Sequence, residues 1–263
     1  MEVIVRKDAE AAARLTARLI ADAIRVKPDL VLGLATGRTM ERVYEMLVEE
    51  HKYRGLDFTY VVTFNLDEYV GLAPSDPCSY SAYMHYHLFR HVNINPANAH
   101  VPRGNAADLE EECRRYEALI AAHGGIDLQL LGIGLTGHIG FNEPMSSLRS
   151  RTRLKALSPV TLQQNSEYFG GVDKVPRRAI TVGVGNILES KRAIMLATGE
   201  EKADIVARAL EGPVTAMVTA SALQLHPRCV VILDEGAAAN LTMRDYYDHI
   251  FHTEPEWAPY RSL

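Results

Sequence analysis

The 263-residue sequence has little cysteine and no long cluster of basic residues, and each shortage argues against a class of protein. Its cysteines, Cys78, Cys113 and Cys229, are scattered without a CxxC pair, so the sequence predicts neither a disulfide framework nor a zinc knuckle. We expect free thiols in the cytoplasm. Basic residues occur at most in short pairs and the formal net charge is −5, which argues against nucleic acid as a partner.

Long hydrophobic runs are also missing. Arg and Asp interrupt the N-terminal segment repeatedly, so it lacks the apolar core of a signal peptide, and no later run approaches a membrane span. We therefore expect a soluble cytoplasmic protein with no membrane partner. No repeat or linker interrupts the chain, which predicts one domain over residues 1–263, with a C-terminal tail from about residue 248.

Short apolar runs alternate with helical patterns along the chain. The runs cover 30–35, 60–66, 126–134, 193–199 and 229–236, and helical patterns follow at 38–52, 79–90 and 200–211. This alternation predicts βαβ units on a mostly parallel sheet, preceded by one helix of about twenty residues. Polar, glycine-bearing segments follow four of the runs. Ligands bind at the carboxyl ends of such strands, so these segments should converge on one crevice.

Two of these segments have the form of anion sites. "LGLATGRT" (Leu32–Thr39) and "LATGEEK" (Leu196–Lys202) each join a strand to a helix start through a glycine turn. Backbone N–H groups and the helix dipole then point at an anion, and a phosphate would fit, although a plain tight turn has the same pattern. Lys202, in a first helical turn, opposes the dipole unless an anion is bound. Neither a Walker A loop nor GxGxxG is present.

The other two segments carry acids and a histidine. "VVTFNLDEYVG" ends a strand with Asp67 and Glu68, and we take Asp67 as a candidate general base on a carbon acid, the alternative being a solvated turn acid. "GIGLTGHIGFNEP" places His138 and Glu143 in a glycine-rich turn. The carboxylate could hold the imidazole tautomer in an acid/base relay, although a structural, hydrogen-bonded histidine is the alternative.

Further histidines lie in "YMHYHLFRH", on an expected helix. His87 and His91 would share one face of that helix, as metal ligands at this spacing do. No acidic or cysteine ligand lies nearby to complete such a site. We therefore expect a packed or exposed helix face there and no metal.

The segments "LGLATG", "VVTFNLDEYVGL", "GHIGFNEP", "SRTRLK" and "LQLHP", in this order and spacing, resemble the glucosamine-6-phosphate deaminase family, also called glucosamine-6-phosphate isomerase. The resemblance covers almost the whole chain. It implies a Rossmann-like, doubly wound α/β fold with helices on both faces of the sheet. It also implies a homo-oligomer, such as a hexamer, and a cofactor-free conversion of glucosamine 6-phosphate and water to fructose 6-phosphate and ammonium.

The resemblance assigns roles to individual residues. Asp67 matches the enolisation base, which takes the proton from C2 and returns it at C1. His138 matches the residue that opens the pyranose ring, and Glu143 matches its acidic partner. The residues that match the phosphate site are Thr36, Gly37, Arg38, Thr39 and Lys202.

Two features depart from the family pattern. Thr136, which we group with the catalytic residues, stands where well-known members carry Asp and some carry Asn, and its hydroxyl can form hydrogen bonds but carries no charge. Glu167 stands where the family often carries a phosphate-binding arginine, whereas Arg38 replaces a small residue of the phosphate loop. Our hypothesis is that the guanidinium has moved to position 38, where it can grip phosphate and pair with Glu167.

Ser146, Arg153 and Lys155 match the N-acetylglucosamine 6-phosphate activator site that lies at subunit contacts in hexameric bacterial members. An ordinary basic surface strand is the alternative for this stretch.

Three other functions share some of these features. A 6-phosphogluconolactonase is similar in fold, but that family lacks the glutamate of "FNEP" and needs no enolisation base. A deaminase for another amino-sugar phosphate, such as galactosamine 6-phosphate, fits the same motifs. The sugar-sensing domain of a transcription regulator would need a DNA-binding module, for which the expected N-terminal helix leaves no room.

Overall fold

The large sheet of this computed structural model, which describes residues 1–263, has seven parallel strands in the order β1-β10-β9-β6-β2-β3-β5. The strands are β1 (Glu2–Arg6), β2 (Val31–Leu34), β3 (Val62–Asn65), β5 (Ala99–His100), β6 (Leu128–Leu131), β9 (Ala193–Ala197) and β10 (Cys229–Asp234). The predicted α/β class and parallel sheet are therefore confirmed.

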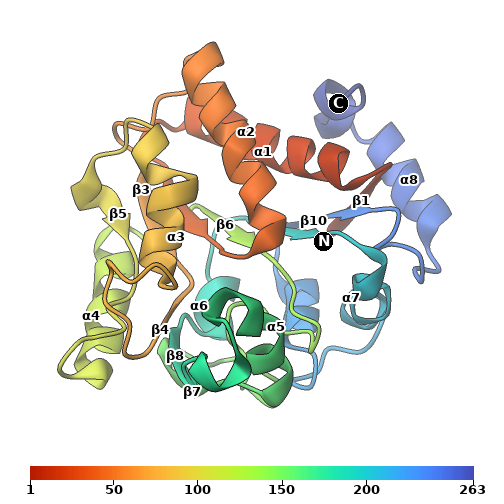
Figure 1. Ribbon diagram of the computed structural model, residues 1–263. Coiled ribbons are helices and arrows are strands. Elements are labelled where there is room, and N and C mark those ends of the chain that lie inside the picture. Colours follow the sequence, from red (N-terminus) through yellow and green to blue (C-terminus); the bar gives the residue numbers. More distant parts are fainter.

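Helices cover both faces of this sheet, with α1 and α2 together on one side and α6 on the other (Figure 1). The α-helices are α1 (Ala9–Val26), α2 (Arg38–Arg54), α3 (Tyr80–His87), α4 (Leu109–Ala122), α5 (Pro159–Phe169), α6 (Val184–Leu188), α7 (Ala203–Leu210) and α8 (Arg244–Thr253). Short 3-10 helices include η1 (Phe89–His91), η4 (Glu200–Lys202) and η6 (Pro255–Tyr260). None of the helices combines the length and the apolar character needed to cross a membrane.

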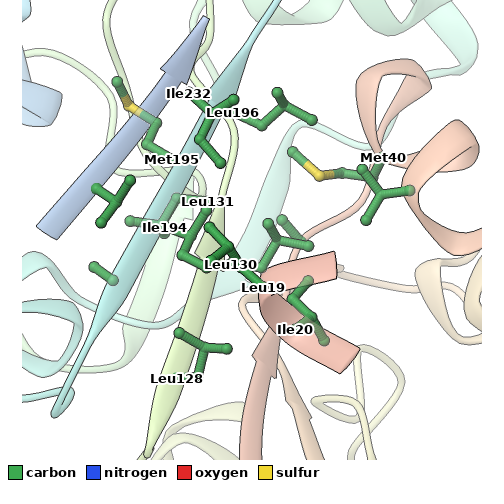
Figure 2. Packing of buried hydrophobic residues seen from close by; sticks show 14 of the residues in the cluster. Leu19, Ile20, Met40, Leu128, Leu130, Leu131, Ile194, Met195, Leu196 and Ile232 are labelled. Carbon is green, nitrogen blue, oxygen red and sulfur yellow. The ribbon is translucent and has the colours of Figure 1, made fainter. Parts of the chain in front are cut away.

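The core lies where the central strands meet α1. Leu130 and Leu131 of β6 pair in register with Ile194 and Met195 of β9, and Leu19 of α1 packs nearby (Figure 2). These strands are buried on both faces, which is why they read as continuous apolar runs in the sequence. Each such side chain contributes about 1.5–3 kcal/mol to stability through burial.

A second, smaller sheet was not predicted. It is antiparallel, in the order β4-β8-β7, with β4 (Asp67–Tyr69), β7 (Arg153–Ala156) and β8 (Arg178–Thr181). Its apolar cluster is separate from the main core and includes Tyr69, Phe141 and, from α5, Leu162. This small sheet matters for function because its first strand begins with Asp67.

The chain termini pack against each other. β1, which the sequence patterns did not predict, forms one edge of the large sheet, and α8 contacts it. The expected tail from about residue 248 forms the second half of α8 and then η6. Trp257 of η6 is only 1% exposed, and its Nε1 donates a hydrogen bond to Glu2 Oε2 at 2.8 Å. The tail therefore covers an edge strand that would otherwise be open to pairing.

Truncation of this aromatic anchor should destabilise the whole protein. We expect Trp257→Ala to lower the free energy of unfolding by about 3–5 kcal/mol, because it leaves a cavity and unpairs the Glu2 carboxylate. Urea denaturation measures the effect, and Tyr246→Ala, which removes an exposed aromatic ring of α8, is the control. If both variants lost the same free energy of unfolding, the packing of the tail through Trp257 would be contradicted.

Candidate active site

A cleft of about 670 Å³ opens at the carboxyl ends of the strands. It is lined by residues that follow β2, β3, β6 and β9, namely 35–40, 66–67, 132–135 with His138, and Thr198 with 201–202. The four polar segments picked out in the sequence thus meet in one place, as predicted. Part of α5 forms a further wall.

Asp67 faces this cleft from the start of β4. No backbone or side-chain group donates a hydrogen bond to its carboxylate, which is almost fully buried. Burial and, secondarily, the charge of Glu68 raise the pKa of Asp67 to about 8. Such a poorly solvated carboxylate is a stronger base than one in water, as proton abstraction from carbon requires.

Glu68 is buried as well, but it has a different environment. Its carboxylate accepts hydrogen bonds from the backbone N–H groups of Tyr69, Tyr80 and Ser81, at 2.9 to 3.0 Å. It therefore anchors the N-terminus of α3, while its neighbour Asp67 points into the cleft, since successive strand residues alternate between faces. Neither acid is the solvated turn residue of the alternative interpretation.

His138, Thr136 and Glu143 form a compact triangle. His138 Nδ1 lies 2.7 Å from the Thr136 hydroxyl and 3.3 Å from Glu143 Oε2. The hydroxyl lies 3.2 Å from the same oxygen and donates to it. Because the hydroxyl has one proton and gives it to Glu143, it accepts from Nδ1–H. This network selects the tautomer of His138 that leaves Nε2 free to accept a proton.

The Nε2 edge of the imidazole lies against Gly134. A Cβ atom at position 134 would come within 2.2 Å of His138 Nε2, so the ring occupies the space that any side chain there would fill. The backbone N–H of Gly134 also donates to the His138 carbonyl at 2.9 Å. The glycine-rich turn therefore serves to seat the imidazole, a role that the sequence analysis did not identify.

Glu143 is held on its other side by α5. Its Oε1 accepts from the Thr161 hydroxyl at 2.5 Å and from the Ser158 backbone N–H at 3.0 Å. Burial alone would raise the pKa of Glu143, but hydrogen bonding and charge interaction with His138, together with the Thr161 and Ser158 bonds, lower it to about 2. The carboxylate is therefore ionised at neutral pH and fixed by partners from two segments.

The opposite end of the cleft is cationic. α2 begins there after Gly37, whose φ of 110° lies in the region that favours glycine. No side chain caps this helix start, and residues of its first turn line the cleft. Lys202 Nζ donates to the Ile133 carbonyl at 2.9 Å and forms no salt bridge. Burial lowers the pKa of Lys202, Glu201 opposes this effect, and the nearby Arg38 adds to it. Two cations and a helix start together suit a phosphate.

Residues of the suggested activator site lie outside the cleft. Ser146 is buried and its hydroxyl has no partner, while Arg153 Nη1 donates to Asn142 Oδ1 at 2.9 Å. Lys155 lies two residues further along β7, on the same face as Arg153. Since Asn142 directly precedes Glu143, Arg153 contacts the segment that carries Glu143.

The histidine pair of the α3 region shows no metal-site geometry. The His87 ring packs against Tyr83 with 4.3 Å between ring centroids, and His91 Nε2 lies 3.0 Å from the Tyr86 carbonyl. No group of three or more His, Cys, Asp or Glu side chains is placed to hold a metal ion. The expectation of a packed or exposed helix face fits His87, whereas His91 lies beyond α3, in η1.

The sequence analysis missed the wall that α5 contributes. Thr161, Gln164, Asn165 and Tyr168 line the cleft, and Thr161 also holds Glu143. A polar face at helical spacing within 159–169 was the available signal. It carried no motif, so it did not stand out.

Comparison with known proteins gives a consistent result. Residues 6–231 match the family described as glucosamine-6-phosphate isomerases/6-phosphogluconolactonase. The chain belongs to this family. Within the family, a glucosamine-6-phosphate deaminase of Arthrobacter sp. (strain FB24) is 47% identical over 257 residues, which cover 98% of this chain and 99% of that protein.

Solved structures of the family agree. A structure described as a monomeric glucosamine-6-phosphate deaminase is 46% identical with a TM-score of 0.90, covering 91% of this chain and 100% of that one. A 6-phosphogluconolactonase from Trypanosoma cruzi is 20% identical with a TM-score of 0.75, covering 92% and 97% of the two chains. The second likeness concerns the fold alone.

A methyl group at position 134 should disable the site without unfolding the protein. We expect Gly134→Ala to lower any activity that uses His138 by about 100-fold or more, because the Cβ must displace the imidazole. Gly132→Ala is the matched control, since its Cβ would meet only the flexible Met40 Cε at 3.3 Å. Steady-state kinetics and melting curves of both variants make the comparison; equal activities would refute the proposed seating of His138.

Proposed function

We propose that the chain is a glucosamine-6-phosphate deaminase, an isomerising hydrolase that converts glucosamine 6-phosphate and water to fructose 6-phosphate and ammonium. One observation supports this most directly. A buried carboxylate without hydrogen-bond donors, Asp67, shares a cleft with a His138 whose Nε2 is free and with a cationic end. This combination provides a base for carbon, a proton carrier for oxygen and a binding site for phosphate.

The reaction begins with a closed sugar ring. The phosphate binds at the start of α2 beside Arg38 and Lys202, which orients the sugar along the cleft. His138 Nε2 takes the proton of the O1 hydroxyl and delivers it to the ring oxygen as the C1–O5 bond breaks. Glu143 stabilises the transient imidazolium through Thr136, so the histidine returns to its starting state.

The open-chain aldehyde then isomerises. Asp67 removes the proton from C2, the electron pair moves toward the C1 carbonyl, and the ammonium group of the substrate gives a proton to O1, which yields an enolamine. The same carboxyl group returns the C2 proton at C1, which leaves a protonated imine at C2. Water adds to this imine, the C–N bond breaks, and ammonium leaves with fructose 6-phosphate as the second product. No step consumes an oxidant or reductant.

The test is turnover of glucosamine 6-phosphate by the purified protein, followed as fructose 6-phosphate and ammonium. Galactosamine 6-phosphate and 6-phosphogluconolactone are the parallel substrates. We expect Asp67→Asn to lower kcat by about 10²–10⁴-fold, because general-base catalysis contributes on that scale. Hydrolysis of the lactone with no release of ammonium from either amino sugar would reject the deaminase assignment.

Thr136 should act by connecting His138 to Glu143. We expect Thr136→Val, which keeps the shape but removes the hydroxyl, to lower kcat by about tenfold or more, since a hydrogen bond to a charged group is worth ~1.5–3 kcal/mol. KM should stay near its original value because Thr136 does not line the cleft. Thr136→Ser should retain most of the activity. A valine variant as active as the serine variant would contradict the connection.

Assembly, regulation and location are parts of the same proposal. We place the reaction in N-acetylglucosamine catabolism in the cytoplasm, where the free thiols Cys78, Cys113 and Cys229 suit a reducing compartment. The homo-oligomer and an activator site at Ser146, Arg153 and Lys155 stay predictions, and the similar solved deaminase is described as monomeric. Light scattering measures the oligomeric state, and turnover with and without N-acetylglucosamine 6-phosphate measures activation.

A further inference from the structure

An ion pair spans the mouth of the cleft at its cationic end. Arg38, the first residue of α2, lines the cleft, and its Nη1 lies 3.4 Å from Oε2 of Glu167 on α5. The two side chains are 71% and 74% exposed, so solvent screens the pair. Glu167 itself stands at the rim, next to Tyr168, which does line the cleft. The guanidinium expected to bind substrate therefore already has an anionic partner.

The other charges at this end make that partner significant. Lys202 and Arg38 are close enough that the charge of Arg38 contributes to lowering the pKa of Lys202. Glu201 lies beside Lys202, and Glu41 lies in the first turn of α2. Of these two cations, which repel each other, Arg38 is paired with a carboxylate, whereas Lys202 forms no salt bridge. A phosphate placed between the two cations would therefore compete with Glu167 for Arg38.

We propose that Glu167 is an affinity determinant that occupies the Arg38 guanidinium in the empty cleft and must be displaced by the phosphate of the ligand. The inference rests on the proposed function, because it requires a phosphorylated substrate. A phosphate carries nearly two charges and several acceptor oxygens, so it outcompetes one exposed carboxylate. Glu167 therefore weakens the binding of every phosphorylated ligand by the cost of breaking the pair. It raises KM without touching the reacting atoms.

The same displacement links α5 to occupancy of the cleft. While Glu167 is paired with Arg38, α5 is joined to α2 across the opening, and phosphate binding releases that connection. At its start, α5 contacts Glu143 through Ser158 and Thr161. One helix thus contacts the phosphate end of the cleft at one terminus and the proton relay at the other.

The experiment measures binding of inorganic phosphate by calorimetry and KM for glucosamine 6-phosphate in a double-mutant cycle. We expect Glu167→Gln to bind phosphate about two- to fivefold more tightly, as expected for loss of an exposed ion pair, with a matching fall in KM and little change in kcat. Arg38→Ala should weaken binding. In the Arg38→Ala background, Glu167→Gln should change nothing further.

Asp173→Asn is the matched control. Asp173 lies in the short 3-10 helix η3 (Val172–Lys174), which follows α5 after two glycines. Its side chain is 93% exposed and pairs with Arg177 at 3.5 Å away from the cleft, so its neutralisation should leave phosphate affinity unchanged. Three results would overturn the inference: unchanged or weaker phosphate binding in Glu167→Gln, an equal gain in Asp173→Asn, or a gain that survives in the Arg38→Ala background. The predicted phosphate affinities without any deaminase turnover would support the inference and reject the proposed function alone.

Discussion

The buried carboxylate of Glu143 is the contact on which the geometry of the site depends. It accepts hydrogen bonds from Thr136, Thr161 and the backbone of Ser158, and it lies 3.3 Å from His138 Nδ1. These partners come from the glycine turn after β6 and from the start of α5. A charge buried in this way is tolerated only because it is fully paired. The same pairing fixes the imidazole and positions one wall of the cleft.

The three acids of the site differ in the hydrogen-bond donors that surround them. Asp67, Glu68 and Glu143 are all buried, yet only Asp67 lacks hydrogen-bond donors. Glu68 and Glu143 satisfy their charges with backbone or hydroxyl donors and serve as anchors. Asp67 is left with an unsatisfied charge, and an unsatisfied carboxylate binds a proton strongly. The unsatisfied carboxylate of Asp67 thus costs the fold some stability, whereas Glu68 and Glu143 hold the surrounding segments in place.

Much of this arrangement could be predicted from local patterns. The glycine turns around Thr36 and Gly199 have the form of helix starts, and the spacing of His138 and Glu143 predicted their contact, because both signals depend on nearby residues. The small sheet could not be predicted in this way. Its strands have only three or four residues, so even the alternation of Arg153 and Lys155 with apolar residues in β7 is too short to stand out. The part played by Thr161 depends on tertiary packing, which no local pattern reports.

The ends of the chain meet on one edge of the large sheet, and this has a consequence for synthesis. β1 pairs only with β10, in a register that joins Glu2 to Val230, and Trp257 then covers the same strand. β10 lies far later in the sequence than β1, so β1 finds its neighbour only after β10 has left the ribosome. Until then its backbone groups stay unpaired and its apolar side chains stay uncovered, so a strand that is translated before its partner reaches its native place late.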